Sequence, residues 1–493
     1  MQPLSDRTAG FTDSVIRRMT RISNKYGAVN LSQGFPDFDP PKAILDRLAE
    51  VAHEDYHQYS ITWGAQNFRE ALAAKQTRYM GRTIDPNSEI VVTCGSTEAM
   101  MTAMMTVTNP GDKVVIFSPF YENYGADTIL TGAEPIYVPL TPPDFTFDPE
   151  VLENAFRQHP KALILCNPSN PCGKVFTRDE LELIAGLAKK YDVYVITDEV
   201  YEHIVYAPRT HTYFAALPGM WERTISCSSL SKTYSVTGWR LGYVIAPAPI
   251  IERAKKVHDF LTVGAAAPLQ EAIIPGLRFG QDYYDDLLAK YTHKRDLFCK
   301  GLDALGLVHN VPQGAYYVMM DISEFGYDSD LQFCEELAAK VGVGAVPGSS
   351  FFREPVNHLI RFHFAKKDET LNDALNRLEA LRMRAIAPLQ TLERALSTGG
   401  ARGISCALYA LMEDVGVKEQ LEARIERARE DADEATALEY EQAYEVVISL
   451  LEQMEALAEP EVSAGRYAEL LRLAASQSRL GIIPATLDCV LVI

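Results

Sequence analysis

Seven short apolar runs between residues 90 and 246 limit most strongly what this chain can fold into. Several runs are continuously apolar rather than alternating, which is typical of strands covered on both faces of a sheet. Helical intervals such as 178–190 separate some of them, as in a doubly wound fold. We therefore expect an α/β protein with a mostly parallel sheet of about seven strands. The runs are Ile90–Thr93, Val114–Phe117, Pro135–Leu140, Ala162–Cys166, Val193–Thr197, Thr224–Cys227 and Leu241–Ala246.

The composition predicts a cytoplasmic protein of more than one domain. With 493 residues, of which 47% are hydrophobic, the chain can bury more than one core. No apolar run is long enough to span a membrane, and the N-terminus lacks the layout of a signal peptide. A net charge of −19 argues against binding to nucleic acid or to an anionic membrane. The eight cysteines include no CxxC pair, so we expect neither a metal site nor a disulfide framework.

The segment that joins the last two runs carries a lysine in a setting that suits a phosphate. A lone lysine in a polar loop is usually a solvated surface residue. Here, however, hydroxyl groups surround Lys232, and a guanidinium follows eight residues later. These neighbours are Ser229, Ser231, Thr233 and Arg240. Such donors favour a phosphate, and an amine beside a phosphate is what a pyridoxal phosphate enzyme needs.

Polar residues also follow the ends of other predicted strands, where sites in parallel sheets collect. Asp198 closes a buried apolar run, and its carboxylate there needs a cation unless it caps a helix. A protonated pyridine nitrogen is one such cation. Ser96 and Thr97 open a helix whose free N–H groups suit a phosphate. These residue types also cap helices for purely structural reasons.

Two further positions indicate contact with a ligand. Gly34 lies in a stretch rich in Gly and Pro, between Gln33 and Phe35, and it allows the backbone to approach a ligand closely. A plain connector is the alternative interpretation of that stretch. Arg361 lies within the apolar run Leu359–Phe364, where an arginine is rarely without a partner. Its planar guanidinium suits a carboxylate.

The order SLSK…TGWRLGY around Lys232 resembles the lysine segment of class I and II aminotransferases, which are pyridoxal phosphate enzymes of fold type I. The phrase NLSQGFPDF resembles the N-terminal segment of the kynurenine and glutamine–phenylpyruvate aminotransferase branch. The resemblance covers residues 1–386. It implies that Lys232 holds the cofactor as an internal aldimine, that Asp198 binds the pyridine nitrogen, and that Arg361 clamps the substrate α-carboxylate.

The same resemblance implies roles for the other candidate residues. Tyr121 stacks on the pyridine ring, while Asn170 and Tyr201 approach the phenolic oxygen of the cofactor. Asn170 also lies near the substrate carboxylate, which the backbone of Gly34 faces. Tyr59 reaches across a dimer interface to the cofactor phosphate of the other subunit, so we expect a homodimer. The cofactor site is completed by Ser96, Thr97, Ser229 and Arg240.

These motifs predict an aminotransferase that moves an amino group from an L-amino acid to a 2-oxo acid by a ping-pong mechanism. The freed amine of Lys232 would serve as general base and acid at the substrate Cα. Two alternatives stay open at this point. One is a C–S β-lyase on the same scaffold, and the other is a binding subunit of a DNA-repair assembly. The expected partners are small-molecule amino acids and 2-oxo acids of a biosynthetic process.

We expect four regions along the chain. Residues 1–44 would form an N-terminal arm and part of a small domain, and residues 45–290 the large cofactor-binding domain. Residues 291–386 would complete the small α+β domain, and residues 387–493 a helical appendage with 19 acidic against 9 basic residues. The appendage resembles part of the B subunit of bacterial ATP-dependent helicase–nuclease complexes. It carries neither a GxxxxGK motif nor a cysteine cluster for an iron–sulfur site.

Overall fold

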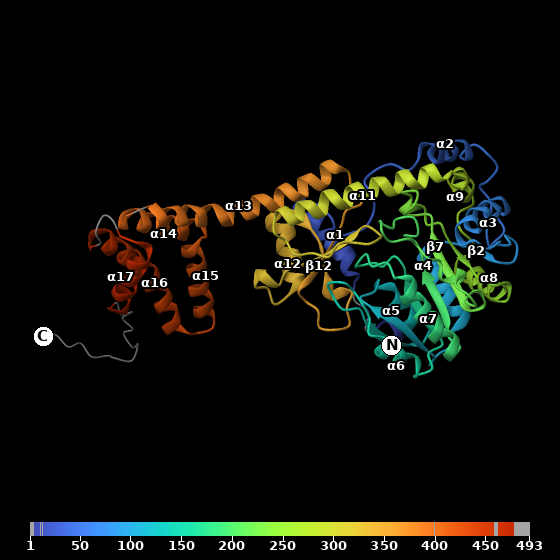
Figure 1. Cartoon of the computed structure of the whole chain (residues 1–493), viewed down its shortest axis with the longest axis horizontal. Helices are drawn as coiled ribbons and strands as arrows, with labels where there is room; N and C mark the ends of the chain where they lie inside the picture. Colours follow the sequence, from blue (N-terminus) through green and yellow to red (C-terminus); the bar gives the residue numbers. More distant parts are fainter. Residues whose placement is uncertain (1–3, 10, 12, 399, 458–461, 478–493) are drawn as a thin grey trace. The chain divides into compact units, whose positions relative to one another are not determined.

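A seven-stranded sheet forms the centre of the larger part of the computed structural model (Figure 1). The structure describes residues 4–477 except residues 10, 12, 399 and 458–461. The strand order is β2-β8-β7-β6-β5-β3-β4. Strand β8 is antiparallel to β2 and β7, and the other neighbouring strands are parallel, so the predicted sheet is confirmed. The strands are β2 (Ile90–Thr93), β3 (Lys113–Ser118), β4 (Glu134–Pro139), β5 (Ala162–Cys166), β6 (Tyr194–Asp198), β7 (Thr224–Ser229) and β8 (Gly242–Ile245).

Helices on both faces of this sheet explain why its strands are continuously apolar. In β3, Val114 and Ile116 belong to the core on one face, whereas Val115 and Phe117 belong to the core on the other. Successive side chains of a strand point to opposite faces, so a strand covered twice must be apolar throughout. The covering helices are α4 (Ser96–Val107) and α8 (Ala248–Thr262) on the first face, and α6 (Pro149–Phe156) and α7 (Arg178–Tyr191) on the second.

Local sequence signals start several of these helices. Thr177 and Glu180 form a capping box at the start of α7, in which each side chain accepts a hydrogen bond from the backbone N–H of the other. Asp148 caps α6 through the N–H of Glu150. The remaining helices of this part are α2 (Lys42–Val51), α3 (Gln66–Met80), α5 (Asn123–Leu130), α9 (Ala267–Ala272) and α10 (Ile274–Leu277).

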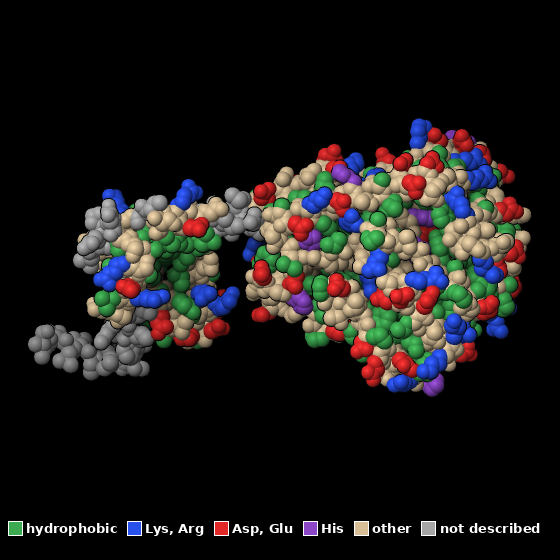
Figure 2. All heavy atoms as spheres, viewed as in Figure 1, with side chains coloured by type: hydrophobic (Ala, Val, Ile, Leu, Met, Phe, Trp, Pro, Cys, Tyr) green, Lys and Arg blue, Asp and Glu red, His purple; other side chains and the backbone are tan. Residues whose placement is uncertain are grey.

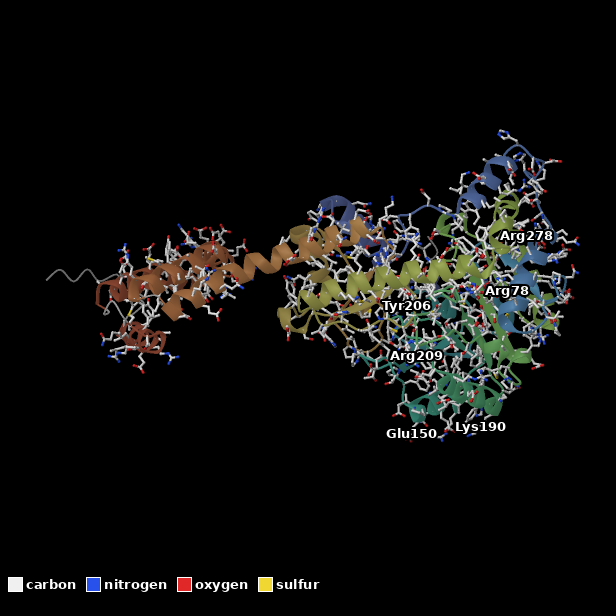
Figure 3. The ribbon with its side chains drawn as sticks, turned by 45° about the horizontal axis from the view of Figure 1, so that its top comes forward. Arg78, Glu150, Lys190, Tyr206, Arg209 and Arg278 are labelled. Carbon is white, nitrogen blue, oxygen red and sulfur yellow. The ribbon has the colours of Figure 1, made fainter. Side chains whose placement is uncertain are left out.

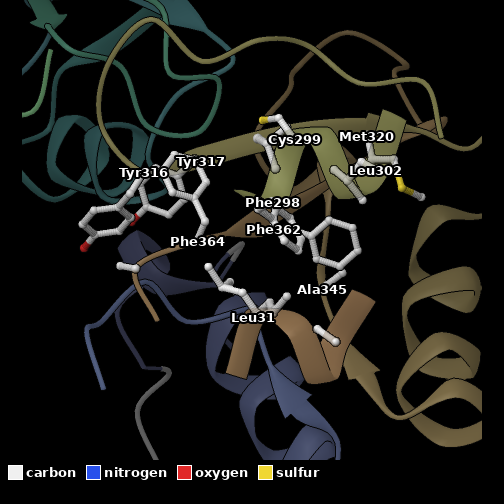
Figure 4. Packing of buried hydrophobic residues seen from close by; sticks show 14 of the residues in the cluster. Leu31, Phe298, Cys299, Leu302, Tyr316, Tyr317, Met320, Ala345, Phe362 and Phe364 are labelled. Carbon is white, nitrogen blue, oxygen red and sulfur yellow. The ribbon is translucent and has the colours of Figure 1, made fainter. Parts of the chain in front are cut away.

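A second core joins the N-terminal segment to residues 281–378. Leu31 packs there with Phe298, Met320 and Phe362, which come from three different elements (Figure 4). The strands form the antiparallel order β11-β12-β9 and a separate parallel pair, β1 with β10. The elements are α1 (Val15–Tyr26), β1 (Val29–Asn30), α11 (Gln281–Ala304), β9 (Tyr317–Asp321), α12 (Asp330–Glu336), β10 (Val343–Gly344), β11 (Val346–Pro347) and β12 (Leu359–His363).

The C-terminal part of the chain is helical, as the sequence predicts. The chain divides into two compact units, 1–378 and 379–493. Helix α13 spans Asp368–Thr398 and therefore crosses residue 386, the predicted boundary between the small domain and the appendage. The other helices are α14 (Ala401–Asp414), α15 (Val417–Glu430), α16 (Glu434–Leu457) and α17 (Ala464–Gln477).

The surface shows no segregation of charge on the face that Figure 2 presents. Lys and Arg side chains are interspersed there with Asp and Glu over residues 1–378. Throughout the described ranges, every helix is too short or too polar to cross a membrane. Among the same residues, no group of three or more His, Cys, Asp or Glu side chains is placed to hold a metal ion.

Candidate active site

A cavity of about 240 Å³ brings together nearly all of the candidate residues at the carboxyl ends of the parallel strands. Asp198 ends β6 and Ser229 ends β7, while Ser96 begins the helix after β2. The carboxyl ends of parallel strands lie at the same edge of a sheet, so the topology places these residues close together. The candidate residues in the lining are Gly34, Ser96, Thr97, Tyr121, Asn170, Asp198, Tyr201, Ser229, Lys232, Arg240 and Arg361.

Lys232 lies in this cavity with its amine held by the N-terminal segment. Its Nζ donates to the backbone carbonyl of Gly34 at 3.2 Å and lies 5.9 Å from the centre of the Tyr316 ring. Burial, followed by the charge of Arg240, lowers the pKa of Lys232 to about 8. The lowered pKa increases the share of uncharged amine relative to a free lysine, and the uncharged amine is the form that acts as a nucleophile or a base.

Beside the lysine, several donors without protein partners surround Arg240. The buried hydroxyl of Ser231 and that of Thr237 have no hydrogen-bond partner among the described residues. Gly95 has a φ of +82°, and a Cβ there would collide with the Arg240 guanidinium. Gly95 is also the N-cap residue of α4 and no side chain caps this helix, so Ser96 does not serve as its cap. The free N–H groups of the first turn, the hydroxyls and the guanidinium together form a cradle for a phosphate.

Asp198 is a buried carboxylate on the other side of the cavity. Its Oδ2 accepts a hydrogen bond from the Tyr124 hydroxyl at 2.6 Å, and its Oδ1 accepts one from the Val200 N–H at 3.3 Å. Burial raises the pKa of Asp198. A cationic ligand group beside this carboxylate would remove that penalty, because an opposite charge favours the ionised form.

Arg361 is the corresponding buried cation, and it has no carboxylate partner. Its Nη1 donates to Asn170 Oδ1 at 2.7 Å and its Nη2 to the Ser32 carbonyl at 2.8 Å. The Nε has no partner among the described residues, and the rings of Tyr317 and Phe351 lie 4.4 and 4.6 Å from the guanidinium carbon. Burial lowers the pKa of Arg361. A planar guanidinium held in this way can bind a carboxylate with two hydrogen bonds.

Tyrosines close the cavity around Gly34. The Tyr316 hydroxyl donates to the Gly34 carbonyl at 2.9 Å, and the hydroxyls of Tyr201 and Tyr317 lie 2.9 Å apart. A Cβ at Gly34 would collide with the Tyr317 hydroxyl, so the backbone passes this ring only because residue 34 is glycine. The cavity thus has a lysine amine, a phosphate cradle, a buried carboxylate and a buried guanidinium within one enclosure.

Comparison with known proteins identifies the family to which this site belongs. The family profile described as aminotransferase class I and II matches residues 26–378. The chain belongs to this family. The protein is therefore a pyridoxal phosphate-dependent aminotransferase of fold type I, and the predictions of family, fold and cofactor are confirmed. Residues 379–493 lie outside the match.

The relatives of this aminotransferase act on different amino acids. A probable N-succinyldiaminopimelate aminotransferase of Mycobacterium tuberculosis is 35% identical over 387 residues, which cover 76% of this chain and 98% of the relative. Kynurenine–oxoglutarate transaminase 3 of Mus musculus is 37% identical over 399 residues, covering 75% of this chain and 88% of the relative. An Escherichia coli structure with methionine aminotransferase function has a TM-score of 0.74 at 35% identity, covering 77% and 99% of the two chains. These relatives do not favour the lyase alternative.

The residues of the cavity fit pyridoxal phosphate. The unpartnered hydroxyls beside Arg240 suit its phosphate, the buried carboxylate of Asp198 suits its ring nitrogen, and the amine of Lys232 suits its aldehyde. All three groups are buried, and the cofactor would offer each of them a hydrogen-bonding, ionic or covalent partner.

Sequence reasoning missed two residues of the aminotransferase site, and the structure leaves one candidate outside the cavity of its own chain. Tyr124 and Tyr316 contact Asp198 and Gly34 but carry no motif of their own. Tyr59 does not line the cavity, and its side chain is 88% exposed. The signal that could have found Tyr124 is its closeness to Tyr121 in the sequence, since its N–H donates to the Tyr121 carbonyl at 3.0 Å in the turn that leads into α5.

None of the candidate residues lines a second cavity, which has a volume of about 570 Å³. Tyr206 and Arg209, both labelled in Figure 3, line it, and the Arg209 N–H donates to the Tyr206 carbonyl at 2.9 Å. The other cations in its lining are paired, Arg295 with Asp296 at 2.6 Å and Lys174 with Glu180 at 2.8 Å.

Proposed function

We propose that this aminotransferase transfers an amino group from an L-amino acid to a 2-oxo acid by a ping-pong mechanism, with Lys232 as its catalytic residue. The observation that carries the proposal is the position of the Lys232 amine. It is buried in one cavity with Asp198 and Arg361, and its pKa is lowered to about 8. General acid–base catalysis is most effective when the pKa of the catalytic group lies near the working pH.

Lys232 would first anchor the cofactor and later move a proton. Pyridoxal phosphate supplies an electron sink that stabilises negative charge at the substrate Cα. Once the incoming amino acid has displaced it, the Lys232 amine would be free to take the proton from the substrate Cα and to hold it until it is returned. Burial of this amine lowers its pKa and so raises the share of the uncharged form that can take the proton.

Arg361 and Asn170 would orient the substrate. The free Nε of Arg361 and the hydrogen bond from its Nη1 to Asn170 support a role in binding the α-carboxylate, which all amino acid substrates share. The carbonyl of Gly34 holds the Lys232 amine and the Tyr316 hydroxyl, and its backbone would face the same carboxylate.

The remaining residues would hold the cofactor. Asp198 would keep the ring nitrogen protonated, and the Tyr124 hydroxyl orients that carboxylate. Tyr121 would lie against the ring, and Tyr201 would approach the phenolic oxygen. The phosphate would take its hydrogen bonds from Ser96, Thr97, Ser229 and Arg240.

We propose a homodimer because large apolar side chains lie exposed around Tyr59. Tyr59 is 88% exposed, Phe260 92%, and Val263 48%. Tyr59 and Val263 line the same groove, and contiguous exposed apolar groups of this size mark contact surfaces. Sedimentation velocity should give a dimer, and mixing Tyr59→Phe with Lys232→Ala protomers should restore activity. A fully active monomer would exclude the proposal. The cytoplasmic location and the biosynthetic role stay predictions.

A panel of amino donors with 2-oxoglutarate or pyruvate as acceptor tests the reaction. Parallel double-reciprocal lines over both substrates are expected, because the two half-reactions share one cofactor site. Release of ammonia and a 2-oxo acid from a single amino acid, with no need for an acceptor, would contradict the proposal.

A further inference from the structure

One tyrosine of the active-site cavity, Tyr317, is left without a role in the proposed reaction. It begins β9, lines the cavity and is only 3% exposed. Its ring lies beside that of Tyr316, with the ring centres 4.9 Å apart (Figure 4). Its hydroxyl lies 2.9 Å from the hydroxyl of Tyr201, which the proposed function assigns to the phenolic oxygen of the cofactor. Tyr317 is therefore one hydrogen bond away from a residue that would contact the cofactor.

The ring of Tyr317 and its hydroxyl make separate contacts. The ring centre lies 4.4 Å from the guanidinium carbon of Arg361, and this cation–π contact needs only an aromatic ring. The hydroxyl makes its hydrogen bond with the hydroxyl of Tyr201. A phenylalanine at position 317 would therefore keep the contact with Arg361 and lose the one with Tyr201.

The direction of this hydrogen bond follows from the number of hydrogens available. A tyrosine hydroxyl has one hydrogen to donate and lone pairs with which it accepts. Burial raises the pKa of both Tyr201 and Tyr317, so both hydroxyls keep their hydrogens near neutral pH. Within the pair alone, either hydroxyl can be the donor. When Tyr201 gives its hydrogen to a third group, it can only accept from Tyr317.

A second pair of buried tyrosines shows that such a bond is not by itself a sign of function. The hydroxyls of Tyr234 and Tyr284 also lie 2.9 Å apart, and these residues are 0% and 3% exposed. Neither of them belongs to the lining of the active-site cavity, whereas Tyr201 and Tyr317 both do. The position at the cavity is what distinguishes the pair formed by Tyr201 and Tyr317.

We propose that Tyr317 is a positioning residue whose hydroxyl donates to Tyr201 and thereby directs the single hydrogen of Tyr201 to the phenolic oxygen of the cofactor. This inference rests on the proposed function, in which Tyr201 approaches that oxygen. In a chain of hydrogen bonds each donor strengthens the next one. Tyr317, from β9, therefore favours the ionised form of the phenolic oxygen by acting through Tyr201, which follows β6.

An absorbance titration of the full-length holoenzyme between pH 5 and 10 tests this inference, because ionisation of the phenolic oxygen changes the spectrum of the cofactor. Tyr317→Phe should move the midpoint of the titration upward by about 0.4 to 1 pH unit, the range expected for loss of one hydrogen bond between neutral groups. The direction is upward because a lost donor destabilises the ionised form. Tyr201→Phe removes the direct donor and should move the midpoint further.

The double variant Tyr201→Phe/Tyr317→Phe decides whether Tyr317 acts through Tyr201. Its midpoint should equal that of Tyr201→Phe alone, because the two effects are then not additive. Equilibrium dialysis with pyridoxal phosphate gives a second readout that needs no spectral change. Tyr317→Phe should raise the Kd by about two- to tenfold, and the double variant should again match Tyr201→Phe. The KM for amino donors should stay unchanged in Tyr317→Phe, because the ring beside Arg361 is kept.

The matched control is Tyr284→Phe, which removes a hydroxyl from the other buried pair and should leave the midpoint and the Kd unchanged. If Tyr201→Phe moves the midpoint and Tyr317→Phe does not, the role of Tyr317 alone is overturned. Effects that add up in the double variant would also overturn it, since Tyr317 would then act on the cofactor directly. An unchanged midpoint and Kd in Tyr201→Phe would contradict the proposed function at Tyr201, and the inference with it.

Discussion

The catalytic unit, residues 1–378, differs in its hydrophobic cores from the C-terminal unit, residues 379–493, which includes the appendage. Four clusters of buried hydrophobic residues support the described part of the catalytic unit. The described appendage has one small cluster, formed by Ala401, Ile404, Met454 and Tyr467. Along α16, Leu451 and Met454 are buried, but Val447 is 38% exposed.

Charged residues show the same contrast. In the catalytic unit, Lys75 pairs with Glu202 at 2.7 Å, with side chains only 1% and 3% exposed. The Tyr213 hydroxyl and the Gln76 amide also donate to this carboxylate, at 2.8 and 3.1 Å. In the appendage, Arg402 pairs with Glu455 with both side chains in water. A large core can support buried charges whose hydrogen bonds are all made, and a small helical unit keeps its charges solvated.

The largest effect should come from the catalytic lysine. Lys232→Ala should lower transamination by more than about a thousandfold, because it removes both the anchor of the cofactor and the general base. Lys418→Ala, an exposed lysine of α15, is the matched control and should leave kcat unchanged. Borohydride reduction followed by peptide mapping should place the cofactor on Lys232. Full turnover by Lys232→Ala would show that this lysine has only a structural role.

Removing one partner of each ion pair tests whether the buried pair contributes more to stability than the exposed pair. Glu202→Ala leaves Lys75 buried without a partner and should cost about 3–5 kcal/mol of unfolding free energy. Glu455→Ala removes one side of an exposed pair and should cost less than about 1 kcal/mol. Urea titrations followed by tyrosine and tryptophan fluorescence measure both. Equal costs would show that the Lys75–Glu202 pair is hydrated in solution.

Cofactor capture should depend on pH through Lys232. Its pKa is lowered to about 8, so the amine is mainly protonated below that pH and neutral above it. Only the neutral amine attacks the cofactor aldehyde. The rate of capture by the cofactor-free protein should therefore fall about tenfold per pH unit below 8 and level off above it. Stopped-flow absorbance over pH 6–10 checks this, and a rate still rising at pH 10 would contradict the lowered pKa.

The smallest effect should come from removing the appendage. Deletion of residues 399–493 should keep kcat within about threefold, because every candidate residue lies before residue 362. Steady-state kinetics on matched amino donors, with sedimentation to follow oligomer size, test this. A loss of orders of magnitude with the cofactor still bound would mean that the appendage contributes to the site, and the proposed domain division at 386 would be wrong.

The roles that were predictable from the sequence depend on local patterns. Lys232, Asp198 and Arg361 stand out because a charged residue next to or within an apolar run has few structural explanations. The seven strands were predictable because burial on both faces demands continuous apolar runs. The course of α13 past residue 386 was not, because a proline such as Pro388 ordinarily ends or kinks a helix.

By itself, the sequence determined the family, the sheet and the chemical identity of the cofactor residues, because each is encoded within short segments. Only the tertiary structure decided which side chains meet. Tyr124 and Asp198 are 74 residues apart, and Lys75 and Glu202 are 127 apart. The same packing brought Tyr59 to the surface and Arg361 into contact with Asn170. Contacts between distant segments arise from how helices pack on the sheet, and no local pattern of residues records that packing.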